Sequence, residues 1–144
     1  MPSPLENLAA QTPHLTAEPW DEKEFRGLVT SGQARLHDAQ IFTLSLESRF
    51  DLAYNAAHAL CLAALRRQGY RAKNRYIVFQ VLPHTLGLGP EVWRILAKCH
   101  DMRNLAEYEG GYNLDVRLLE DLIQAANVVL RALTIAVPPS PTFP

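Results

Sequence analysis

The sequence of 144 residues has no excess charge of either sign, few cysteines and no long apolar run. It carries 14 Lys and Arg against 15 Asp and Glu, which gives a net charge of −1. This balance excludes a general nucleic-acid coat protein and a polybasic membrane-surface protein, because both need a large positive excess. Two cysteines are too few for a disulfide-rich fold, and no apolar stretch is long enough to span a bilayer. With 48% hydrophobic residues, the chain can bury one globular core.

Motifs that bind metals, or that bind phosphates through a loop, are also missing. No His-x-x-x-His or Cys-x-x-Cys spacing occurs, so no metal site and no cofactor are expected. Gly87-Leu88-Gly89 lacks the preceding strand and the third glycine of a dinucleotide-binding loop. Cys61 and Cys99 fall within helical patterns, and we interpret them as small buried residues of a reducing compartment. Together with the lack of a signal-peptide pattern, this predicts a cytoplasmic protein.

Proline is almost absent from the middle of the chain. Of ten prolines, only Pro83 and Pro90 lie within residues 20–137. Because proline resists helix interiors, this distribution predicts a folded domain over residues 20–137. Residues 1–19 are then an N-terminal extension that is partly ordered, and residues 138–144 are a proline-rich flexible tail.

Leucine and alanine, with 22 and 18 residues, are the most frequent residues, and both favour helices. Apolar residues recur at steps of three and four, which is the pattern of amphipathic helices. The predicted helices are 21–40, 45–68, 74–86, 90–108 and 113–135, with one further short helix over 4–11. The β-branched and aromatic residues of 74–86 also suit a strand, but we favour a helix because no partner strand is found elsewhere. Short connections predict an all-α fold, an up-and-down bundle of four to five helices.

Arg103 is predicted to lie on the core-facing side of its helix, because Val92 and Leu96 share its direction. His100 and Glu107 flank it at three and four residues. A buried guanidinium needs partners, because its desolvation is costly.

The helix of residues 45–68 carries a matching polar stripe. Its residues step by four, three and four along one flank of the apolar face, namely Glu47, Asp51, Tyr54 and His58. If this stripe meets the helix of Arg103, the two line a polar pocket in or at the mouth of the bundle. The alternative is a structural ion pair of Arg103 with Asp51 or Glu107, since structural networks also collect charge.

Two segments carry a resemblance to a known family. Residues 49–58 read Arg-Phe-Asp-Leu-Ala-Tyr-Asn-Ala-Ala-His, and residues 102–108 read Met-Arg-Asn-Leu-Ala-Glu-Tyr. Together they resemble the HEPN domain family, the nucleotide-binding or RNA-cleaving helical domains of prokaryotic toxin and defence systems. The similarity spans residues 20–135 and implies an up-and-down bundle that is usually a homodimer. In its ribonuclease members, an arginine binds the scissile phosphate and a nearby histidine handles protons, without a metal.

This resemblance assigns phosphate binding to Arg103 and Asn104, but Tyr108 stands where the motif has its histidine. Tyrosine is a poor general base at neutral pH, because its unperturbed pKa is about 10, although it can stack on a base. His100 and His58 are candidates to replace the histidine. The resemblance thus implies nucleotide or RNA binding and leaves two alternatives open. One is a metal-independent endoribonuclease or toxin-type subunit. The other is a non-catalytic interaction module, either a toxin–antitoxin partner subunit beside a protein such as a nucleotidyltransferase or a small helical scaffold.

A basic run follows the helix of residues 45–68. Five of the 14 basic residues fall within ten positions, namely Arg66, Arg67, Arg71, Lys73 and Arg75. Tyr70 and Tyr76 are interleaved with them, so the run predicts an RNA-binding surface in which aromatic rings support phosphate contacts. The alternative is a solvated helix end and loop without a binding role.

Overall fold

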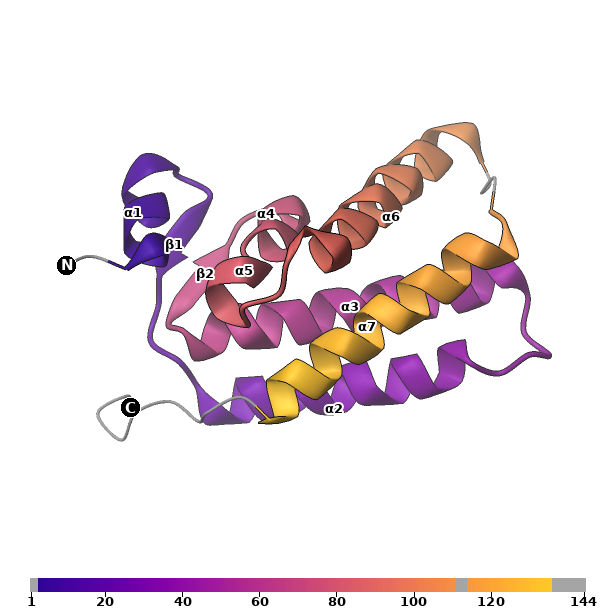
Figure 1. Ribbon diagram of the computed structural model, residues 1–144, viewed down its shortest axis with the longest axis horizontal. Helices are drawn as coiled ribbons and strands as arrows, with labels where there is room; N and C mark the ends of the chain where they lie inside the picture. The colour runs from indigo at the N-terminus through magenta and orange to yellow at the C-terminus, as the bar shows by residue number, and fades with distance from the viewer. Residues whose placement is uncertain (1–2, 111–113, 136–144) are drawn as a thin grey trace.

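The computed structural model describes residues 3–110 and 114–135, without the side chains of residues 107–109 and 135 (Figure 1). In chain order the elements are α1 (Pro4–Gln11), β1 (Leu15–Ala17), α2 (Glu22–Ala39), α3 (Leu46–Arg67), β2 (Tyr70–Ala72), α4 (Arg75–Gln80), α5 (Leu82–Thr85), α6 (Pro90–Glu109) and α7 (Val116–Ile135). Helices dominate the described residues, which confirms the predicted all-α helical bundle.

Polar caps fix where the long helices begin and end. The Ser45 hydroxyl accepts a hydrogen bond from the backbone N–H of Ser48 at 3.1 Å and so starts α3. The Asp21 carboxylate accepts from two backbone N–H groups and starts α2. Gly69 follows α3 with a φ of +87°, a left-handed conformation that favours glycine. These side chains satisfy backbone groups that a helix end leaves without partners.

The central helix of the fold is α3, and most of its residues are buried. It packs against α2 along one side and α7 along another, while α4 and α6 pack against each other and also contact α3 (Figure 1). Phe50 and Leu60 of α3 meet Leu96 of α6 and Leu122 of α7 in one hydrophobic core. The amphipathic stripes that predicted the helices are therefore the surfaces that pack together.

A two-stranded antiparallel sheet interrupts the helical pattern. β1 pairs with β2 in the register Leu15 to Ala72, Thr16 to Arg71 and Ala17 to Tyr70. The expectation that the chain offers no partner strand was wrong, because three-residue strands are too short for an alternating pattern to be visible. The segment 74–86 itself is helical, as predicted, but divides into α4 and α5.

The N-terminal segment packs on the rest of the molecule. Leu5 and Leu15 are 4% and 1% exposed and belong to the same core cluster as the long helices. The segment 1–19, predicted as an extension, therefore contributes α1 and β1 to the folded body. The predicted tail of residues 138–144 lies outside the described residues. Among the described helices, none has both the length and the apolar character needed to cross a bilayer.

Candidate functional site

The predicted polar stripes of α3 and α6 meet at Tyr54 and His100. The Tyr54 ring is fully buried, and its hydroxyl oxygen lies 2.8 Å from Nδ1 of His100. The two rings also stack, with centroids 6.3 Å apart and planes inclined by 23°. This contact joins two residues that lie 46 positions apart in the sequence and belong to different helices.

Arg103 lies one turn beyond His100 on α6 and is half-buried. Its position follows from the apolar stripe of α6, because Val92 and Leu96 are buried in the core. The guanidinium carbon of Arg103 lies 5.2 Å from the centre of the Tyr54 ring. The prediction that Arg103 faces inward is thus correct, although its side chain stops at an aromatic face and does not enter the core.

A second arginine, Arg75 at the start of α4, approaches the same ring. Its guanidinium carbon lies 5.6 Å from the centre of the Tyr54 ring, and Nη1 donates to Oδ1 of Asn55 at 3.4 Å. Within the described part of the chain, Arg75 forms no ion pair with a carboxylate. Arg75 belonged to the predicted basic run but not to the predicted pocket, since sequence periodicity does not show that α4 folds back over α3.

Two polar contacts, to Tyr54 and to Asn104, hold the His100 ring in place. The Asn104 amide nitrogen lies 3.2 Å from Nε2 of His100. With that amide as donor, the ring proton is on Nδ1 and is donated to the Tyr54 oxygen. Burial lowers the pKa of His100, Asp101 opposes this shift, and Arg75 and Arg103 lower the pKa further. The surroundings of His100 thus disfavour its charged form, and the two arginines bring positive charge to the site.

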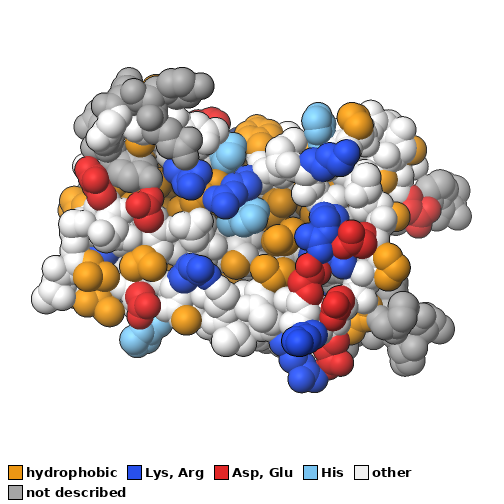
Figure 2. Space-filling model, turned by 180° about the vertical axis from the view of Figure 1, so that it is seen from behind, with side chains coloured by type: hydrophobic (Ala, Val, Ile, Leu, Met, Phe, Trp, Pro, Cys, Tyr) orange, Lys and Arg blue, Asp and Glu red, His pale blue; other side chains and the backbone are white. Residues whose placement is uncertain are grey.

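His58 completes the site from α3. Its ring lies edge-on to that of Phe79, with centroids 6.1 Å apart. Burial lowers the pKa of His58 to about 4, and Arg75, His100 and Arg103 contribute through repulsion. Figure 2 shows Lys or Arg side chains gathered beside histidines on this side of the molecule, with hydrophobic atoms around them. We call this group the arginine–histidine site, which consists of Tyr54, His58, Arg75, His100, Arg103 and Asn104.

The remaining predicted pocket residues are placed less centrally. Asp51 is half-buried on α3, one turn before Tyr54. Asp51 and Arg103 each have an interaction partner, and the alternative ion pair between these two residues stays a prediction. The side chains of Glu107 and Tyr108 lie outside the described residues, so the alternative ion pair of Arg103 with Glu107 is untested.

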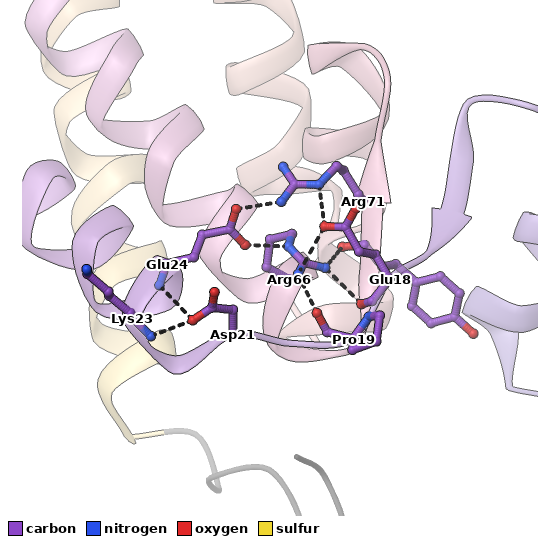
Figure 3. A network of polar contacts seen from close by, with 8 residues as sticks. Glu18, Pro19, Asp21, Lys23, Glu24, Arg66 and Arg71 are labelled. Carbon is purple, nitrogen blue, oxygen red and sulfur yellow. Dashed lines mark hydrogen bonds and ion pairs between the residues drawn. The ribbon is translucent and has the colours of Figure 1, made fainter.

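The predicted RNA-binding run does not form one surface. Arg66 and Arg67 are only 2% and 7% exposed. Arg66 donates to Glu24 and to the backbone oxygens of Glu18 and Pro19 (Figure 3). Its guanidinium is therefore saturated by partners from the N-terminal segment.

The other basic side chains of the run divide between two roles. Arg71 pairs with both Glu18 and Glu24 (Figure 3), while Arg67 donates to the backbone oxygen of Leu133 in α7. These buried or paired arginines do not join the predicted RNA-binding surface, because Glu18, Glu24 and the backbone of α7 provide their partners. Lys73 is exposed, and Arg75 turns into the arginine–histidine site.

The chemistry that this site offers is anion binding by two arginines beside two histidines whose pKa values are lowered. In the part of the chain that the structure describes, no three His, Cys, Asp or Glu side chains are grouped so as to hold a metal ion. Cys61 and Cys99 are free and buried, and burial raises the pKa of both thiols.

Comparisons with family models, with curated proteins and with solved structures give no match.

Proposed function

We propose that this protein binds the phosphate group of an RNA or a nucleotide between Arg75 and Arg103. The observation that carries the proposal is that two guanidinium groups share one buried tyrosine ring. The two positive charges lie near the same ring and repel each other, and the repulsion grows where water is partly excluded. A phosphate oxyanion relieves this repulsion and matches the planar donor geometry of guanidinium.

The resemblance to HEPN domains supports the same ligand class. It assigns phosphate binding to Arg103 and Asn104, and both of these residues stand at the arginine–histidine site. The bundle architecture is also the one that the resemblance implies.

The binding test is a titration of a fluorescently labelled octaribonucleotide at low salt, followed by anisotropy. Arg75→Gln and Arg103→Gln should each weaken binding about ten- to hundredfold, since a charged hydrogen bond contributes about 1.5–3 kcal/mol. Arg94→Gln is the matched control, because Arg94 is an exposed arginine of α6 that stacks on Trp93, outside the site. Equal affinity of all three variants and the wild type would contradict phosphate binding at Arg75 and Arg103.

Metal-independent cleavage of RNA is a further step that His100 would support. The 2′-oxygen would bond to phosphorus while the bond to the 5′-oxygen breaks. Nε2 of His100 would take the 2′-hydroxyl proton, and water would supply the proton that the 5′-oxygen gains. Incubation with RNA in EDTA tests this step. Cleavage by the wild type but not by Arg103→Ala or His100→Gln supports it; equal cleavage, or none despite binding, contradicts it.

The second candidate function, an interaction module, is favoured by an apolar surface just after the C-terminal end of α2. Phe42 is 87% exposed, and Ile41, Leu44 and Val116 are also exposed. A groove of about 600 Å³ next to Phe42 is lined by residues of α3 and α7. Such a surface suits a homodimer or a protein partner such as a nucleotidyltransferase. Light scattering after gel filtration tests the homodimer: a dimer that Phe42→Ser converts to a monomer supports it, and a monomeric wild type contradicts it.

A further inference from the structure

Tyr76 is an aromatic side chain at the edge of the arginine–histidine site that the fold itself does not require. It follows Arg75 in the first turn of α4 and is 36% exposed. The buried contacts of α4 are made by Val78 and Phe79, which are 2% and 0% exposed. In the described part of the chain, the hydroxyl of Tyr76 makes no hydrogen bond. Neither core packing nor a polar network therefore explains the position of this ring.

The geometry connects Tyr76 to the site. The Tyr76 ring lies with its centroid 6.2 Å from that of His100, and the two planes are tilted by 55°. Asn74 fixes this arrangement, because its side-chain oxygen accepts from the backbone N–H of Ile77 at 2.9 Å and caps α4. An exposed aromatic ring thereby lies against His100, a member of the site that also contains the two guanidinium groups proposed to bind phosphate.

Single-stranded nucleic acids bind through this combination of groups. Cationic side chains contact the phosphate, and an exposed aromatic ring stacks on the base. A duplex does not offer a free base face, and inorganic phosphate offers none. Lys73, which is exposed three residues before Tyr76, adds a positive charge near the N-terminus of α4.

We infer that Tyr76 is a base-stacking residue, so that the ligand of this site is an unpaired nucleobase linked to a phosphate. This inference rests on the proposed phosphate binding at Arg75 and Arg103. The ligand can be a free mononucleotide or a nucleotide within a single strand of RNA, since both present the same base and phosphate.

The test uses the full chain and variants of Tyr76. Tyr76→Leu removes the aromatic ring, whereas Tyr76→Phe keeps it and serves as the matched control. Stacking of one base predicts that Tyr76→Leu weakens binding of a labelled octaribonucleotide about ten- to hundredfold. Tyr76→Phe should bind within about twofold of the wild type. Because Tyr76 is exposed, both variants should keep the circular dichroism spectrum and the melting temperature of the wild type.

Unlabelled competitors separate the base from the phosphate and the two sources of the ligand. Adenosine 5′-monophosphate should compete with the octaribonucleotide better than ribose 5-phosphate does, and Tyr76→Leu should abolish the difference. If the mononucleotide binds with the same affinity as the octaribonucleotide, the ligand is a free nucleotide. If the mononucleotide competes much more weakly, the ligand is a single strand. Both outcomes support the inference.

Three results would overturn the inference, and they show whether the proposed phosphate binding fails with it. Unchanged binding by Tyr76→Leu, together with loss in Arg103→Gln, removes the stacking role and leaves the phosphate site in place. Equal competition by ribose 5-phosphate and the mononucleotide has the same meaning. Absence of any binding to the wild type contradicts both the inference and the proposed function.

Discussion

Arg66→Ala should destabilise the fold strongly, although Arg66 stands in a run of basic residues at a helix end. The guanidinium is 2% exposed and donates to the backbone oxygens of Glu18, Pro19 and Tyr70 and to the Glu24 carboxylate (Figure 3). Alanine leaves three carbonyl oxygens without this donor and removes the cation that pairs with Glu24.

The magnitude follows from what the substitution leaves behind. Removing one partner of a buried ion pair costs about 3–5 kcal/mol, and a buried acceptor without a donor costs about 1–3 kcal/mol. The side chains of Glu18 and Glu24 are 45% and 32% exposed and keep Arg71 as a partner. Water therefore screens part of the loss, and we expect a decrease of about 3 kcal/mol in the free energy of unfolding. For a domain of this size, the melting temperature should fall by about 6–12 °C.

Urea denaturation followed by circular dichroism measures this change. Arg26→Ala is the matched control, because Arg26 pairs with Glu22 on an exposed face of α2. It should change the free energy of unfolding by less than about 0.5 kcal/mol. A loss of under about 1 kcal/mol in Arg66→Ala would refute the structural role of Arg66 and return it to the candidates for RNA binding.

Three further predictions concern charge, close packing and thiol reactivity. Folding lowers the pKa of His58 from 6.5 to about 4, so only the unfolded chain takes up this proton between pH 6.5 and 4. The free energy of unfolding should therefore fall as the pH drops through this window, by up to about 3 kcal/mol, and His58→Phe should flatten the dependence. Gly32→Ala should destabilise the fold by about 1–3 kcal/mol in the same denaturation assay, because the added Cβ would lie 2.7 Å from the Leu60 side chain. Gly27→Ala is the control: open space surrounds that position, so it should stabilise the fold by up to about 1 kcal/mol. Cys61 and Cys99 should resist iodoacetamide until the protein unfolds, and mass spectrometry of the native chain would contradict this by detecting alkylation.

The helices could be predicted because their signals are local. Ser45, Asp21 and Gly69 mark helix ends, and apolar residues at steps of three and four mark the faces that pack. The meeting of Tyr54 with His100 could be predicted for the same reason, since both flank apolar stripes that must face the core.

Features that depend on long-range pairing could not be predicted. The strands of three residues are too short to show alternation, and β1 finds its partner more than 50 residues away. The burial of Arg66 depends on Glu18 and Glu24, and nothing in the local sequence shows that these acidic residues fold over the end of α3. Arg75 likewise reaches Tyr54 only because α4 packs against α3 and α6.

The salt dependence of oligoribonucleotide binding tests the two-arginine phosphate site most directly. Each phosphate neutralised on a single strand contributes a slope of about −0.7 in log affinity against log salt, so the one phosphate bound between Arg75 and Arg103 predicts a slope of about −0.7. Arg75→Gln and Arg103→Gln should each make this slope shallower, while Arg94→Gln should leave it unchanged. Identical slopes for all four proteins, or a slope that changes only in Arg94→Gln, would contradict a phosphate site between Arg75 and Arg103.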